Sequence, residues 1–412
     1  MKPLEGLRVI DLTVAVAGPV AAHLLGDLGA EVIRVEPPFA RPIAHMDVSP
    51  PVGEGNGHAY NRIVSYNDLQ RSKLGMTLDL SKPAGRDVLL RLAAGSDVVI
   101  ENMAPRVLPQ LGIAFEDLRA ANPRIVLVSM PAFGLDGPWR DRVSYGPGID
   151  AMSGLSWLTG YADRGPMNAS LYYCDYNAGG LAALATIAAL RHRDALGEGV
   201  HVELAMLDGE LQLVADALLD VQMNARVPVR RGNEHPAMAP HGVYPCAGDD
   251  RWIAIACEDD VQWQALCGVL GRADLSHDDR FADVVSRVHH RHELDAIVSE
   301  WTLKRDAQAA ASDLVSVGIA ASAVQDMADV LADPGFAERG LVQWTHHPEA
   351  GAMPHTRAAF TLERTPYAIE RPAPLYGEHI DYVLRELLKM SEEEVRALEA
   401  DGTTRREPPA RQ

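Results

Sequence analysis

The stretch with the clearest chemical potential is LYYCDYNAGGLAALATIAALRHRDALGEG, residues 171–199. It places one carboxylate, Asp175, just before a run of small and apolar residues, Ala178 to Leu190, that is typical of a buried helix. An ionised carboxylate loses solvation in such a place, and no Lys or Arg stands beside it in the sequence. Asp175 could therefore act as a carboxylate nucleophile whose charge is stabilised by the helix dipole.

A structural role explains the same spacing. Asp-Tyr-Asn before a helix is a good capping sequence, because the aspartate can accept hydrogen bonds from the free N–H groups of the first turn. On spacing alone the cap is the preferred interpretation, and the two roles are compatible. Nothing basic lies near the adjacent Cys174 to lower its pKa, so we expect a packed thiol and not a nucleophile.

The remaining motifs favour no other chemistry. The first strand-to-helix turn, TVAVAGP, lacks the GxGxxG pattern, so a nicotinamide enzyme is not expected. The sequence contains no GxSxG, HExxH or Walker motif. The cluster HHRHE at 289–293 cannot present all its histidines on one helix face, which favours an exposed polar helix over a metal site.

The elements that must position Asp175 alternate along the chain. Strand patterns at 7–12, 31–36, 97–102 and 124–130 are separated by helical patterns at 18–30, 83–96 and 114–123. Such alternation predicts βαβ units on a parallel sheet, hence a Rossmann-like α/β domain. Ligands of such sheets bind at the carboxyl ends of the strands.

The pattern predicts a division of the chain into a large and a small domain. Residues 1–224 should form most of the large domain, and 225–331 a small α+β domain that opens with a hairpin within 242–260. Residues 332–412 should return to the large domain, with a strand at 357–363 and a last helix that Ser391 and Glu394 start as a capping box.

Composition excludes several classes of function. The chain has 412 residues, of which 47% are hydrophobic and 23% charged, as in globular proteins. A net charge of −19 argues against a nucleic-acid partner. The absence of a signal-peptide pattern or a 20-residue apolar run leads us to expect a cytoplasmic protein without a membrane partner, and four cysteines without CxxC spacing should be reduced.

Several segments, spread in order over nearly the whole chain, resemble the family III CoA-transferases of the formyl-CoA transferase and carnitine-CoA transferase type. They are PLEGLRVIDLT from residue 3, SKLGMTLDLSKPAG from 72, NPRIVLVSMPAFGLDGPW from 122, CDYNAGGLAALATIAAL from 174, DPGFAERG from 333 and PLYGEHIDYVLRELL from 374. The resemblance places Asp175 on the catalytic aspartate of the family. It implies CoA transfer through an aspartyl mixed anhydride and an aspartyl-CoA thioester, with CoA as a substrate and no tightly bound cofactor.

The resemblance also implies which residues contact CoA. They are Val16 and Ala17 on a loop, Arg34 at the end of the second strand, and Lys73, Met76, Asn102 and Met103. The sequence departs from the family where Pro37 replaces a second basic residue and where Arg106 stands in place of a glycine. We hypothesise that Arg106 replaces the lost phosphate contact.

Two other functions stay open at this point. The runner-up is an α-methylacyl-CoA racemase of the same superfamily, which needs a second proton-handling residue upstream of the aspartate. Tyr145 stands there, and tyrosine, with an unperturbed pKa near 10, is in general a poor proton carrier at neutral pH. The third possibility is a CoA-binding protein without catalysis.

The resemblance implies an interlocked homodimer whose partners are an acyl-CoA and a carboxylic acid. The glycine-rich loop of oxalate-using members is absent, so formate and oxalate are not favoured. We expect a larger acid, such as an aromatic, dicarboxylic or steroid-derived one. Residues 226–242 and the YGPG stretch from Tyr145 should shape its pocket.

Overall fold

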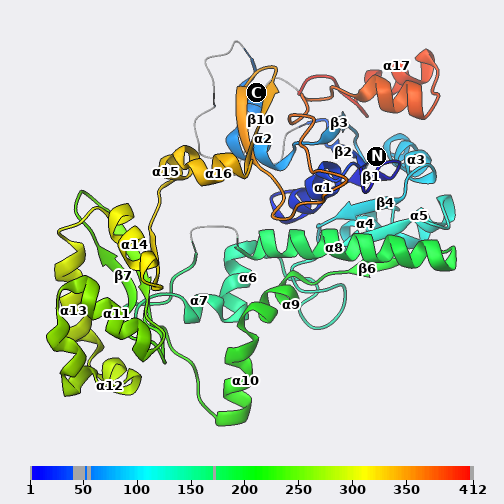
Figure 1. The fold of residues 1–412 in the computed structure, drawn as a ribbon. Helices are drawn as coiled ribbons and strands as arrows, with labels where there is room; N and C mark the ends of the chain where they lie inside the picture. Colours follow the sequence, from blue (N-terminus) through cyan, green and yellow to red (C-terminus); the bar gives the residue numbers. More distant parts are fainter. Residues whose placement is uncertain (1, 40–51, 53–56, 170–172, 409–412) are drawn as a thin grey trace. The chain divides into compact units, whose positions relative to one another are not determined.

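The computed structural model describes residues 2–39, 52, 57–169 and 173–408, and the chain divides into two compact units (Figure 1). The large unit is made of Met1–Ser156, Asn168–Arg226 and Glu338–Gln412. The small unit is made of Trp157–Met167 and Val227–Ala337. The sequence placed the divisions after residues 224 and 331 and assigned no earlier segment to the small domain.

The large unit contains a six-stranded sheet in the order β3-β2-β1-β4-β5-β6, with every neighbouring pair parallel. Its strands are β1 (Arg8–Asp11), β2 (Glu31–Glu36), β3 (Lys73–Thr77), β4 (Val98–Glu101), β5 (Val126–Ser129) and β6 (His201–Glu203). The predicted parallel α/β fold is confirmed. The edge strands β3 and β6 were not predicted, because β3 carries a buried lysine and β6 has only three residues.

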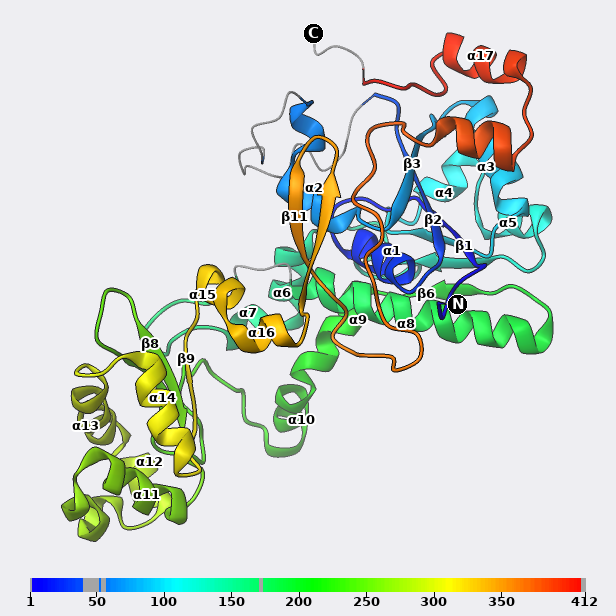
Figure 2. The same ribbon diagram turned by 45° about the horizontal axis from the view of Figure 1, so that its top comes forward.

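Both faces of this sheet are covered, which explains its apolar strands (Figure 2). Val9 of β1 points to the face that carries α1 (Ala17–Asp27) and α8 (Tyr173–Leu196). Its neighbour Ile10 points to the face covered by α3 (Pro83–Ala94), α5 (Phe115–Ala121) and the C-terminal segment. The C-terminal segment of the same chain thus completes the core of the large unit.

The other elements of the large unit connect and flank these layers. Among them are α2 (Val64–Leu69), α4 (Val107–Leu111), α6 (Gly146–Ser153), α9 (Met206–Leu211), α10 (Ala215–Asn224), the antiparallel pair β10 (Val342–His347) and β11 (Gly351–Thr356), and α17 (Glu392–Ala400). Helix α7 (Leu155–Leu158) lies at the division between the units.

Two predictions for the C-terminal segment had different outcomes. The capping box is confirmed, because Ser391 Oγ accepts a hydrogen bond from Glu394 N at 3.2 Å and Glu394 Oε2 accepts one from Ser391 N at 2.6 Å. The predicted strand at 357–363 is wrong. The hairpin ends at Thr356, which pairs with Val342, the first residue of its partner strand.

The small unit contains an antiparallel sheet in the order β7-β8-β9, and its first two strands confirm the predicted hairpin. Its elements are β7 (His241–Pro245), β8 (Trp252–Ala256), α11 (Asp260–Leu270), α12 (Val284–His289), α13 (Arg291–Thr302), α14 (Ala307–Ser316), β9 (Ala320–Ala323), α15 (Met327–Ala332) and α16 (Pro334–Glu338). The histidine cluster does not form one helix, because α12 ends and α13 begins within it. Across the part of the chain that is described, no helix has the length and apolar character needed to cross a membrane.

A buried ion pair ties β3 to the end of β1 in the large unit. Lys73 Nζ donates to Asp11 Oδ2 at 2.8 Å, and both side chains are 0% exposed. The same ammonium group donates to Gln70 Oε1 at 2.9 Å and to the carbonyl oxygen of Pro19, in the first turn of α1, at 3.2 Å. Because all three donors are used, the lysine is satisfied without solvent.

Removing this lysine should destabilise the large unit strongly. Lys73→Met leaves the Asp11 carboxylate buried without its partner, which should lower the free energy of unfolding by about 3–5 kcal/mol. Urea denaturation of the two proteins measures the change. The matched control is Lys304→Met, which breaks the exposed pair with Glu300 and should leave stability nearly unchanged. Equal effects of the two substitutions would contradict this account.

Candidate active site

Asp175 lies inside the first turn of α8, which begins at Tyr173. The structure therefore corrects the capping interpretation, because the aspartate belongs to the helix and does not precede it. Its residue is only 7% exposed. Oδ1 accepts a hydrogen bond from the backbone N–H of Ala17 at 3.3 Å, and Oδ2 has no hydrogen-bond partner among the described residues.

Ala17 is the first residue of α1, so the N-terminal ends of two helices meet at one carboxylate. The free N–H groups and the dipole of each helix favour a negative charge there. Val16, the residue before α1, is buried as well. The two loop residues that the resemblance predicted thus contact or flank Asp175.

A glycine allows the two helices to approach closely enough for this contact. A Cβ atom at Gly179 would lie 2.6 Å from Val20 Cγ1 and 2.8 Å from the carbonyl oxygen of Ala17, closer than any side chain permits. Asp175 and Gly179 are four residues apart and share one face of α8. The close crossing of α1 and α8 therefore brings Asp175 to the start of α1.

Asn102 fixes the loop that leads into α1. Its Nδ2 donates to the carbonyl oxygen of Val14 at 2.9 Å, and its Oδ1 accepts from the N–H of Val14 at 2.8 Å. The next residue, Ala15, adopts a left-handed conformation with φ of +59°. Asn102 follows β4, which is the neighbour of β1 in the sheet, so the sheet order places this amide beside the loop.

Burial, and not a charged partner, dominates the ionisation of Asp175. Desolvation raises its pKa to about 6, the hydrogen bond from Ala17 lowers the pKa, and the negative charge of Asp150 raises it. Burial thus opposes the stabilisation that we expected from the helix dipole. A carboxylate with this pKa is still mostly ionised at pH 7, and its poor solvation leaves its oxygen available for bond formation.

The structure brings two further acids to Asp175 that sequence reasoning missed. Asp150 of α6 accepts a hydrogen bond from the backbone N–H of Cys174, and burial raises its pKa. Burial raises the pKa of Glu210, on α9, to about 7, and the charges of Asp150 and Asp175 add to this effect. The thiol of Cys174 is free and buried, as expected for a packed thiol. The sequence signal that could have identified Asp150 and Glu210 is an acidic residue within an otherwise apolar helical segment.

The other predicted CoA contacts fall into two groups. Arg34, Lys73 and Met76 are buried within β2 and β3. Arg34 Nη1 donates to Gln70 Oε1 at 3.0 Å, the same oxygen that Lys73 uses. Since the donors of Lys73 are all occupied, the geometry gives it an internal role, and its contact with CoA stays a prediction.

Met103 and Arg106 lie beyond the carboxyl end of β4, close in sequence to Asn102. Met103 is half-buried, and its N–H donates to Glu101 Oε2 at 2.7 Å. Arg106 is exposed and directly precedes α4. No ion pair of its guanidinium occurs within the described ranges, so its charge is available to an anionic ligand.

Comparisons with known proteins agree on one family. A family model described as CoA-transferase family III matches residues 4–380. The succinyl-CoA–D-citramalate CoA-transferase of Chloroflexus aurantiacus is 32% identical over 400 residues, which are 97% of this chain and 97% of that protein. The succinate–glutarate CoA-transferase of Agrobacterium fabrum is 34% identical over 385 residues, 93% of this chain and 96% of that protein.

A solved structure shows the same fold. The crystal structure of a CAIB/BAIF family protein from Brucella suis superimposes with a TM-score of 0.85 at 31% sequence identity. The match covers 94% of this chain and 99% of that one.

A side chain at Gly146 should displace the Asp175 carboxylate. A Cβ atom there would lie 2.2 Å from Asp175 Oδ2, so Gly146→Ala should lower kcat for CoA transfer by roughly 100-fold, as misplacement of a reacting group by about 1 Å does. Steady-state kinetics measure the change, and circular dichroism checks the fold. Gly180→Ala, on α8 with nothing within 4 Å of the added atom, is the control and should keep full activity. Full activity of the Gly146 variant would show that Asp175 has room to move.

Proposed function

The chain belongs to the family III CoA-transferases, and we propose that it moves CoA from an acyl-CoA donor to a carboxylic acid through intermediates on Asp175. The observation that carries this proposal is the buried carboxylate itself. Asp175 has one oxygen on a backbone N–H and the other without a partner among the described residues. An oxygen of this kind can form and break an acyl bond.

The first half of the reaction transfers CoA to the enzyme. An Asp175 oxygen attacks the thioester carbon of the donor, the carbon–sulfur bond breaks, and CoA leaves as a thiolate. The thiolate then attacks the side-chain carbonyl carbon of Asp175 and expels the donor acid as a carboxylate. The product is an aspartyl-CoA thioester.

The second half repeats these steps in reverse with the acceptor. Its carboxylate attacks the aspartyl carbon and releases the CoA thiolate, which then attacks the acceptor's acyl carbon and regenerates the Asp175 carboxylate. No step takes up or releases a proton. The reaction therefore needs no paired general acid and base.

Burial supports the chemistry in two ways. The anhydride and the thioester are both hydrolysed by water, and a residue only 7% exposed keeps water away from them. The N–H of Ala17 points at the carboxylate from the start of α1 and would stabilise the oxyanion that forms when the side-chain carbonyl is attacked.

The names of the relatives support a narrower choice of substrates for this proposal. They pair succinyl-CoA or succinate with D-citramalate and with glutarate, which are short dicarboxylic acids. We extend this to the present chain and propose succinyl-CoA as donor and a short dicarboxylic acid as acceptor. The broader expectation of a larger acid included this class. The interlocked homodimer implied by the resemblance is part of the same proposal.

Trapping the intermediate tests the mechanism. Incubation with succinyl-CoA followed by hydroxylamine should leave a hydroxamate on Asp175, detected by peptide mass spectrometry. Asp175→Asn should abolish both the adduct and CoA transfer, because the amide is a far poorer nucleophile. Asp208→Asn, an exposed carboxylate on α9, is the control and should behave as the unchanged protein.

Other outcomes would identify the alternative functions. A racemase would exchange the α-proton of an acyl-CoA with deuterium and leave no adduct, and a CoA-binding protein would do neither. The racemase gains no geometric support, because the Tyr145 residue is 65% exposed.

The role of Arg106 can be tested separately. Its exposed guanidinium should contact a phosphate of CoA, so Arg106→Ala should weaken CoA binding roughly tenfold with kcat unchanged, the value of one charge-assisted hydrogen bond. Isothermal titration with CoA measures the affinity. Arg119→Ala removes another exposed arginine, on α5, and should have no effect. Unchanged affinity of the Arg106 variant would refute the hypothesis.

A further inference from the structure

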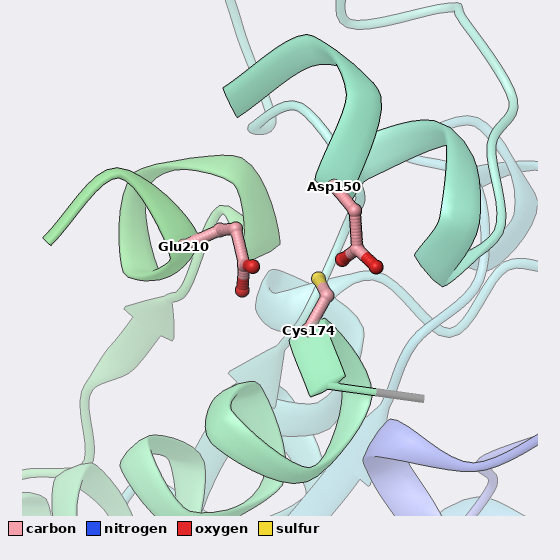
Figure 3. A group of neighbouring side chains, drawn as sticks. All are labelled: Asp150, Cys174 and Glu210. Atoms are coloured by element: carbon pink, nitrogen blue, oxygen red, sulfur yellow. The ribbon is translucent and has the colours of Figure 1, made fainter. Parts of the chain in front are cut away.

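Three helices of the large unit direct potential metal ligands toward one point. Asp150 comes from α6, Cys174 from the start of α8 and Glu210 from α9, and Figure 3 shows the two carboxyl groups and the sulfur facing one another. One ligand atom from each residue lies within 4.8 Å of the other two. The residues are far apart in the sequence, so only the packing of the three helices creates the group.

The group is buried, and no positive charge of a described residue compensates it. Asp150 is 2% exposed, and Cys174 and Glu210 are 0% exposed. Asp150 Oδ1 and both carboxylate oxygens of Glu210 lack hydrogen-bond partners in the part of the chain that the structure describes. Nor does either carboxylate form an ion pair with a Lys, Arg or His of that part. Buried carboxylates with so few hydrogen-bond partners are costly, so such a group needs a cation or protons.

We propose that Asp150, Cys174 and Glu210 bind one divalent transition-metal ion of the Zn²⁺ type. A thiolate with two carboxylates suits Zn²⁺ better than Mg²⁺ or Ca²⁺, which prefer oxygen ligands alone. Bonds of about 2.0–2.3 Å to the metal would separate the ligand atoms by about 3.3–3.8 Å. Small side-chain rotations within the observed limit of 4.8 Å reach that spacing.

The metal would lie among three negatively charged ligands, the carboxylates of Asp150 and Glu210 and the thiolate of Cys174. Cys174 must release its thiol proton when the sulfur binds the metal, and that proton goes to solvent. Three protein ligands leave a fourth position of a tetrahedral site for water. The site adjoins Asp175, the next residue along α8, so a bound cation would reduce the negative potential that Asp150 exerts on that carboxylate. The proposal does not rest on the transfer mechanism, which needs no metal.

Metal titration of the full chain tests the proposal. The protein is stripped with a chelator and titrated with Zn²⁺ against a chromophoric competitor, and one equivalent per chain should bind. Co²⁺ in place of Zn²⁺ should give the near-ultraviolet charge-transfer band of a thiolate ligand. Bound Zn²⁺ should also raise the melting temperature, because it binds the folded state.

Matched variants assign the binding to these residues. Cys174→Ser and Glu210→Gln should each weaken Zn²⁺ binding by roughly 100-fold or more and remove the rise in melting temperature, and Cys174→Ser should also remove the Co²⁺ band. Cys267→Ser removes a buried thiol of the small unit and should bind Zn²⁺ as the unchanged protein does.

Two results would overturn the proposal. One is the absence of a bound equivalent in the stripped, folded protein, which would mean that the carboxyl groups hold protons instead of a metal. The other is Zn²⁺ binding that neither variant weakens, which would place the metal elsewhere. If Glu210→Gln fails to fold, the Cys174→Ser variant and the Co²⁺ spectrum decide.

Discussion

The proposed chemistry of the large unit depends on one constraint. The Asp175 carboxylate must be kept away from water and must still be able to ionise. Burial works against the charge of Asp175 and raises its pKa to about 6. Its Oδ1 atom accepts a hydrogen bond from the backbone N–H of Ala17, and the negative charge of another acid, Asp150, raises its pKa further. Asp175 forms no salt bridge with any described residue, so backbone groups at helix ends hold the charge. A salt bridge would stabilise the carboxylate but would also occupy the oxygen that must react.

Much of the surrounding structure can be understood as support for that arrangement. Gly179 lets α8 approach α1, and Asn102 holds the loop at the start of α1 by both polar groups of Val14. Below this loop, Asp11 accepts hydrogen bonds from the N–H and the hydroxyl of Thr13 while Lys73 neutralises it. These three sets of contacts together fix the end of β1, the loop that follows it and the first turn of α1. This rigidity keeps the Ala17 N–H directed at Asp175 without a ligand.

The residues that the resemblance assigned to CoA binding do not all lie where a ligand could reach them. Val16, Ala17 and Asn102 shape the loop beside Asp175, whereas Lys73 and Arg34 share one oxygen of Gln70 inside the fold. A basic residue at a position that the family uses for CoA can therefore stabilise the protein interior next to the site. The exposed Arg106, which departs from the family pattern, is an accessible cation beyond the end of β4.

The sequence by itself determined the parallel α/β class, the strand at 31–36 and the last capping box, because these depend on local periodicity and on side chains a few residues apart. The contiguous family motifs also led to the proposal of Asp175 as the reacting residue. Only the tertiary structure decided the rest. Strand β3 escaped prediction because its lysine is stabilised by Asp11, 62 residues away. The segment at 357–363 has strand composition, but no described strand pairs with it. Asp150 and Glu210 are ordinary acids in their own helices. They meet at Cys174 because α6, α8 and α9 pack together, and no local pattern records which distant segments share an interior.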